Sequence, residues 1–160
     1  MDGRFTVSSA PALLGRVRRR IGDRCVLGLV KAFCKAGILT EAGAAQTLHD
    51  TSAETPQGGI LSPLLANIAL CALDEHFADA WTAMGDSSAR HRRRRRGQAT
   101  YRLIRYADDF VVMVNGTGDH ANALRAQVSA VLAPLGLRLS EAKTRTMHID
   151  EGFDFLGFRI

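Results

Sequence analysis

The sequence predicts an α+β fold, in which several helices pack against one face of a small antiparallel sheet. Apolar residues recur every three or four positions over 12–36, 64–81 and 120–134, which is the spacing of one helix face. Short runs of β-branched and aromatic residues, separated by turn residues, fill much of 101–114 and 144–160 and favour strands. With 160 residues, of which 46% are apolar, the chain has the size of one domain, or part of one, and enough apolar residues for a core.

The N-terminal part of the chain is predicted to be helical and then to change character. The periodic segment 12–36 is interrupted by Gly22 and Asp23, so we expect two helices, the second ending at Gly37. The residues that follow, 38–54, mix Thr, Gly, Gln and Asp and are expected to form a hairpin or a loop.

The middle of the chain contains a long helix followed by a basic segment. Residues 55–59, Thr-Pro-Gln-Gly-Gly, suit neither a helix nor a strand. Ser62 as N-cap and Pro63 as the first helical residue then begin the predicted helix over 64–81. Residues 84–99 carry Gly, Ser and an arginine run, so we expect a mobile basic loop inserted within the domain.

The C-terminal part is predicted to be mainly β-structure. Two strands meet at a tight acidic turn over 107–109, and two more meet at a turn over 150–152. A helix over 120–134 lies between these pairs and ends at 135–137. The four predicted strands are 101–106, 110–114, 144–149 and 153–160.

The positive charge of the chain is concentrated in arginine. The net charge is +5, and eighteen arginines stand against three lysines. Arg92, Arg93, Arg94, Arg95 and Arg96 are consecutive. Such a run is typical of a surface that binds a phosphate-rich partner, although a solvated loop with no binding role explains the run equally well.

Cysteine usage and hydropathy indicate a cytoplasmic protein. Cys25, Cys34 and Cys71 are far apart and form no Cys-x-x-Cys pair, so we expect reduced, buried thiols in a reducing compartment. No run approaches the ~18 apolar residues of a membrane span, and the basic N-terminal segment does not have the pattern of a secretory signal.

The most informative chemistry lies at Asp108 and Asp109. Two adjacent carboxylates at a hairpin tip repel each other, and their apolar flanks lower the local dielectric. A Mg²⁺ ion offsets that repulsion, because it takes carboxylate oxygens and keeps coordination positions for substrate phosphates. Adjacent strand residues point to opposite faces, so a two-metal site needs a further carboxylate from another strand. An acidic pair in a turn is otherwise simply a turn.

Three stretches of the sequence, taken in order, resemble the reverse transcriptases encoded by group II introns. The stretches are Thr55–Ile68 (TPQGGILSPLLANI), Leu103–Val111 (LIRYADDFV), and Gly136–Thr144 (GLRLSEAKT) followed by Phe155–Phe158 (FLGF). The resemblance covers about residues 12–160. It implies a polymerase palm-like fold and templated DNA synthesis on RNA, with Mg²⁺ as cofactor.

The resemblance assigns roles to individual residues. Asp108 corresponds to the aspartate that binds catalytic Mg²⁺, and Asp109 to its supporting neighbour. Lys143 corresponds to a lysine near the triphosphate, where it is a candidate proton donor to the leaving pyrophosphate; a surface lysine is the alternative. Tyr106 and Ala107 complete the acidic motif, and the small side chain of Ala107 suits a close approach by the primer end.

Two glycine-containing segments are implied to contact the nucleic acid or the nucleotide. Gln57, Gly58 and Gly59 match the loop beside the incoming nucleotide and the template, where glycine permits a close backbone approach and an amide both donates and accepts hydrogen bonds. Leu156 and Gly157 match the hairpin that grips the primer, although an ordinary apolar strand has the same composition.

One metal-binding aspartate of the family has no clear counterpart. By spacing it falls at or just before Met1, and Asp2 is two positions out of register. The fingers that precede this aspartate in the family, and the thumb and RNA-binding maturase domain that follow, have no counterpart in the 160 residues. We therefore expect a palm-centred part of a reverse transcriptase domain.

The expected function is RNA-directed DNA polymerisation, weak or absent in this chain alone. The partners implied are an RNA template, a DNA primer, deoxynucleoside triphosphates and intron RNA, and no membrane. Two alternatives stay open: a non-catalytic RNA-binding remnant of an intron maturase, and an inert gene fragment.

Overall fold

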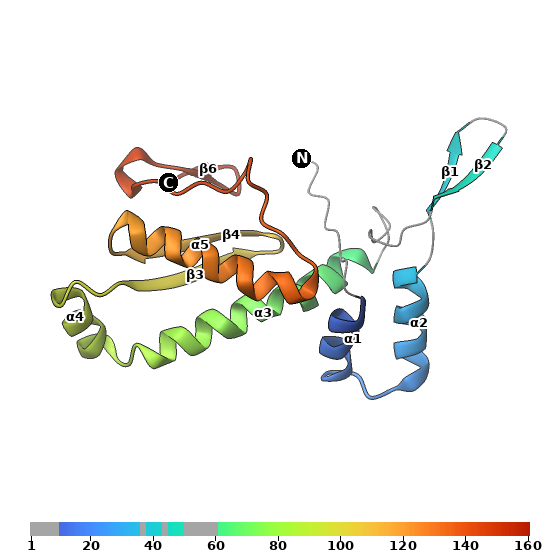
Figure 1. Ribbon diagram of the computed structural model, residues 1–160, viewed down its shortest axis with the longest axis horizontal. Helices are drawn as coiled ribbons and strands as arrows, with labels where there is room; N and C mark the ends of the chain where they lie inside the picture. Colours follow the sequence, from blue (N-terminus) through green and yellow to red (C-terminus); the bar gives the residue numbers. More distant parts are fainter. Residues whose placement is uncertain (1–9, 36–37, 43–44, 50–60) are drawn as a thin grey trace. The chain divides into compact units, whose positions relative to one another are not determined.

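The computed structural model of the chain describes residues 10–35, 38–42, 45–49 and 61–160 (Figure 1). The chain divides into two compact units. The first contains the described residues up to Ala72 together with Leu132–Leu137, and the second contains Leu73–Val131 and Arg138–Ile160. Helices and small antiparallel hairpins make up the described residues, which confirms the predicted α+β mixture.

The first unit begins with the two predicted helices, α1 (Ala10–Arg18) and α2 (Arg24–Lys35). Asp23 starts α2 by capping it, since one carboxylate oxygen accepts hydrogen bonds from the backbone N–H of Cys25 at 2.7 Å and of Val26 at 3.2 Å. The break predicted at Gly22 and Asp23 is confirmed. The helix stop predicted at Gly37 lies outside the described residues.

A hairpin and a long helix follow in the sequence. Strands β1 (Ile38–Ala42) and β2 (Ala45–His49) pair in antiparallel register, which confirms the hairpin predicted within 38–54. Helix α3 (Ser62–Ala83) begins one residue before Pro63, the predicted first helical residue. The N–H of Leu65 donates to the carbonyl of Leu61 at 2.9 Å, so Leu61 occupies the capping position that we assigned to Ser62. A proline in the first turn of a helix has no helical hydrogen bond to lose, so the earlier start of α3 costs no hydrogen bond.

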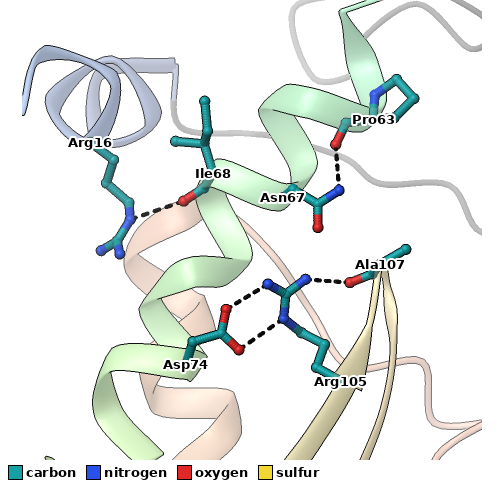
Figure 2. Close-up of polar contacts among 7 residues, drawn as sticks. All are labelled: Arg16, Pro63, Asn67, Ile68, Asp74, Arg105 and Ala107. Atoms are coloured by element: carbon teal, nitrogen blue, oxygen red, sulfur yellow. Dashed lines mark hydrogen bonds and ion pairs between the residues drawn. The ribbon is translucent and has the colours of Figure 1, made fainter. Parts of the chain in front are cut away.

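Leucine and valine side chains form the core of the first unit. Helix α1 contacts α2 and the short 3-10 helix η1 (Ala133–Leu135). The Arg16 Nε also donates to the carbonyl of Ile68 in α3 at 3.1 Å (Figure 2). Buried side chains of this unit are Leu13, Leu14, Val17, Val30, Leu65, Ile68, Ala69, Leu70, Leu132, Leu135 and Leu137.

The second unit contains most of the β-structure. Its elements, after the end of α3, are α4 (Ser87–Arg95), β3 (Thr100–Tyr106), β4 (Asp109–Asn115), α5 (Gly118–Leu132, of which Leu132 lies in the first unit), the 3-10 helix η2 (Ile149–Glu151), β5 (Asp154–Phe155) and β6 (Phe158–Arg159). The expectation of one sheet is wrong for the described strands, because they form three separate two-stranded hairpins. Each hairpin pairs strands that are consecutive in the sequence, so its register is determined locally.

The loop predicted over 84–99 is wrong, because Arg92–Arg95 lie in helix α4 and Arg96 is its C-cap residue. The Asp86 side chain caps the helix by accepting from the N–H of Ala89 at 2.7 Å. Gly97 has φ +71° and follows the last turn, and the N–H groups of Gly97 and Gln98 donate to the carbonyls of Arg94 and Arg93, both at 3.0 Å. This is a Schellman end. Arginine is a good helix former, so start and stop signals around an arginine run define a helix rather than a loop.

The strand predicted over 144–149 is also wrong. The C-terminal hairpin is formed wholly within 153–160, where β5 and β6 are joined by Leu156 and Gly157. Both turn residues have positive φ, +53° and +82°, which is the conformation of tight two-residue hairpin turns. The predicted turn over 150–152 is instead the end of η2.

The three cysteines are free, but they are not all buried as predicted. Cys25 is exposed, and Cys34 and Cys71 are half-buried. Burial raises the pKa of the Cys34 thiol by desolvating its charged form. None of the described helices combines the length and the apolar character needed to cross a bilayer.

Candidate functional site

The acidic pair lies at the tip of the β3–β4 hairpin. The two strands pair without interruption from Thr100 opposite Asn115 to Tyr106 opposite Asp109. Ala107 and Asp108 are left as a two-residue turn, and Ala107 has φ +53°, in the left-handed region. This confirms the predicted tight acidic turn, which is narrower than expected because Asp109 is already the first residue of β4.

Both carboxylates are open to solvent. Asp108 and Asp109 are exposed, and within the described residues neither is engaged by a hydrogen bond or an ion pair. Asp109 is opposite Tyr106 and shares its sheet face, while Asp108 lies on the turn itself. The oxygens of both side chains are therefore available to a cation that approaches the hairpin tip.

Arg105 holds this turn from the last part of β3. Its guanidinium donates from Nε to Asp74 Oδ1 at 3.0 Å and from Nη2 to Asp74 Oδ2 at 2.5 Å (Figure 2). The remaining nitrogen, Nη1, donates to the carbonyl of Ala107 at 2.5 Å. One side chain thus connects helix α3 to the backbone of the residue that precedes Asp108.

The Asp74–Arg105 pair is partly removed from water. The Arg105 side chain is 13% exposed and that of Asp74 is 41% exposed. Further along the same sheet face, the Phe77 ring of α3 packs edge-on against Tyr101 at a centroid distance of 5.8 Å. A bidentate guanidinium–carboxylate pair fixes orientation as well as distance. The pair therefore holds the β3–β4 hairpin against α3 close to its acidic turn.

Sequence reasoning missed the role of this pair. Asp74 directly follows the fully buried Leu73 and precedes the buried Phe77 on α3, so a carboxylate occurs within an apolar stripe. Arg105 is three positions before Asp108 in the acidic motif. A charged side chain at the edge of a buried helix face is expected to have a partner of opposite charge. This expectation is the sequence signal that points to an ion pair at Asp74.

The other face of β3 is open near the acidic turn. Ile104 is 49% exposed and Tyr106 is 67% exposed, although both are large apolar or aromatic residues. Strand alternation places them opposite to Arg105, which faces α3. The β3–β4 hairpin therefore has one face against α3, and beside Asp109 its other face is available to a ligand.

The remaining candidate residues lie at separate places or outside the described residues. Lys143 is exposed in a turn whose backbone closes onto Ser140, and no hydrogen bond or ion pair within the described ranges joins it to the acidic turn. Leu156 and Gly157 form the tip of the β5–β6 hairpin, and Arg92–Arg96 lie on or directly after α4. The residues outside the described part are Asp2, Gln57, Gly58 and Gly59.

The donor set fits a hard cation in part. Asp108 and Asp109 offer carboxylate oxygens that no other described residue engages, and Mg²⁺ prefers such ligands. Across the described ranges, no three His, Cys, Asp or Glu side chains gather closely enough to enclose a metal ion. Two adjacent carboxylates with no third ligand suit an ion that keeps waters and substrate phosphates as its other ligands.

A hairpin that carries exposed adjacent aspartates in the Tyr-Ala-Asp-Asp order is consistent with one family of polymerases. The chain belongs to the reverse transcriptase family, since residues 21–160 match the profile of "Reverse transcriptase (RNA-dependent DNA polymerase)".

Relatives of the chain make the assignment more specific. Over 163 residues the chain is 35% identical to Protein YkfC of Escherichia coli, and over 193 residues it is 28% identical to the group II intron-encoded protein LtrA of Lactococcus lactis. It is also 24% identical to a putative COX1/OXI3 intron 1 protein of Saccharomyces cerevisiae. The resemblance to group II intron-encoded proteins is confirmed.

The similarity covers nearly all of this chain but only a part of each relative. The alignments take in 92% of the chain with YkfC and LtrA and 98% with the yeast protein. The chain spans 42% of YkfC, 32% of LtrA and 22% of the yeast protein.

Proposed function

We propose that the chain contributes the palm of a Mg²⁺-dependent RNA-directed DNA polymerase of the group II intron type. The observation that supports this most strongly is the Asp108–Asp109 turn, exposed on one side and held to α3 by Arg105 on the other. Membership of the reverse transcriptase family supplies the reaction class. The partners under this proposal are an RNA template, a DNA primer, deoxynucleoside triphosphates and intron RNA.

Each candidate residue has a distinct task in the proposed reaction. Asp108 and Asp109 would hold Mg²⁺ through their carboxylate oxygens. The ion, when bound, lowers the pKa of the primer 3′-hydroxyl and neutralises charge on the phosphates. Tyr106 and Ala107 would contact the primer end on the open face, where the small Ala107 side chain leaves room. Lys143 would donate a proton to the leaving pyrophosphate.

The nucleic acid would be held by other parts of the chain. We assign Gln57, Gly58 and Gly59 to the nascent base pair. Leu156 and Gly157 at the tip of the β5–β6 hairpin would contact the primer strand. These assignments follow the family resemblance, and the exposure of Leu156, at 44%, leaves that side chain available to a ligand.

Primer extension tests the proposed reaction. We expect the purified 160-residue chain with Mg²⁺, a poly(rA) template and an oligo(dT) primer to incorporate little or no nucleotide. The reason is that the part of the chain that the structure describes gathers only these two carboxylates at the turn, and a two-metal site needs a further one. Any trace activity should disappear in Asp108→Asn and persist in Asp119→Asn, a control on α5. Robust incorporation by the chain, or activity that survives Asp108→Asn, would contradict this account.

A second candidate function is RNA binding without catalysis. The observation that favours it is the exposed arginine surface of α4, which is on a different element from the acidic turn. Under this alternative, RNA binding is unchanged by Asp108→Asn and the acidic turn binds no divalent ion. Ion binding at the turn therefore distinguishes the two functions.

A further inference from the structure

The arginines of α4 divide into two sets on opposite sides of the helix. With 3.6 residues per turn, Arg92, Arg95 and Arg96 lie within an arc of about 100°. Arg90 and Arg94 lie about opposite to that arc, and Arg93 lies between the two sets. We call Arg92, Arg95 and Arg96 the outer arginines.

Arg90 and Arg94 fasten α4 to its own unit. The Arg90 guanidinium lies over the Trp81 ring of α3 at 4.2 Å from the centroid and donates to the carbonyl of Gly85. Arg94 Nε donates to the hydroxyl of the buried Thr100 in β3 at 3.2 Å. These contacts orient the helix and determine which side of it faces outward.

The outer arginines present unbalanced positive charge. All three are exposed, and α4 itself contains no acidic residue. The ion pairs found among the described residues involve none of them. Like charges three and four positions apart destabilise a helix by a few tenths of a kcal/mol per pair. Anions bound to the three outer arginines would reduce this repulsion.

We propose that the outer arginines dock on the phosphate backbone of a nucleic acid and do not read its bases. Guanidinium groups match phosphate geometry, and Ser87–Arg95 offers no Phe, Tyr or Trp side chain on which a base could stack. The role goes beyond the polymerase site, because α4 and the acidic turn are separate elements. It rests on the proposed nucleic-acid partner but not on catalysis, so primer extension and docking can fail independently.

The test is a salt series of binding to duplex RNA, duplex DNA and single-stranded RNA of unrelated sequences. The variant is the triple change Arg92→Gln, Arg95→Gln and Arg96→Gln, which keeps helix propensity. The matched control removes the same charge from exposed arginines elsewhere, with Arg18→Gln, Arg125→Gln and Arg145→Gln. For duplexes, we expect the outer triple to lower the slope of log K against log salt by about 2 to 3 units and the control triple by less than 1.

Trp81 reports whether α4 stays in place, because it is the single tryptophan of the chain. Its emission should be unchanged in the outer triple and should shift in Arg90→Gln. If the outer triple shifts the emission, the same three arginines are changed to lysine, which keeps the positive charge. A salt slope equal to that of the wild type then supports docking, and a reduced salt slope overturns it. Equal slopes for the outer and control triples, or a loss confined to one base sequence, would also overturn the proposal.

Discussion

Replacing Arg105 with methionine is expected to lower the free energy of unfolding by about 2 kcal/mol. Methionine keeps most of the length of the side chain but removes the three donors that bind Asp74 and the Ala107 carbonyl. The cost is below that of a fully buried pair, because water can reach Asp74, which is 41% exposed. Urea unfolding followed by circular dichroism measures the change.

Controls separate this pair from a general loss of charge. Arg125→Met on α5 removes an exposed arginine and should change the free energy of unfolding by less than about 0.5 kcal/mol. Arg105→Lys keeps the charge without the bidentate geometry and should be intermediate. In a double-mutant cycle, Asp74→Asn should add much less in the Arg105→Met background than in the wild type. Strict additivity would show that the two side chains do not interact.

Replacing Leu73 with alanine is expected to have the larger effect on stability, about 3 kcal/mol. The Leu73 side chain is fully buried on α3, at 0% exposure, directly before Asp74. Its truncation removes apolar contacts and leaves a cavity that the surrounding side chains fill only in part. The same unfolding experiment measures this change.

Leu64→Ala is the matched control, because it makes the same truncation on the same helix at a side chain that is 56% exposed. We expect it to cost less than about 1 kcal/mol. Equal losses for Leu64→Ala and Leu73→Ala would mean that α3 does not bury the face described above.

Much of the local structure could be predicted from the sequence, because short-range signals determine it. Asp23 caps the start of α2, and the apolar period of α3 identifies its buried face. The acidic turn was predicted from the strand-prone runs that flank it. In each case the residues that decide the structure are neighbours in the sequence.

Where composition and position disagree, position determines the structure. The arginine run has the composition of a loop, but Asp86 and Gly97 mark the two ends of a helix. Gly157 is the turn residue that places the C-terminal hairpin within 153–160. The prediction of a single sheet is wrong, because strand propensity does not indicate which hairpins pair with one another.

The link between α3 and the acidic turn could not be predicted, because it joins residues 31 positions apart. Nothing in the local pattern of Asp74 or Arg105 identifies the other as its partner. Only the folded chain brings these two charges together, and their pairing is what connects the candidate site to the core of its unit.

NMR of the full chain with substoichiometric Mn²⁺ tests most directly whether the Ala107–Asp109 turn binds a divalent ion. We predict that amide resonances of 107–110 broaden first, and that Asp108→Asn with Asp109→Asn abolishes this broadening. A matched pair of changes, Asp150→Asn and Glu151→Gln, removes another exposed acidic pair and should leave it intact. Broadening that is spread over all acidic residues, or that survives the loss of both aspartates, would contradict the account.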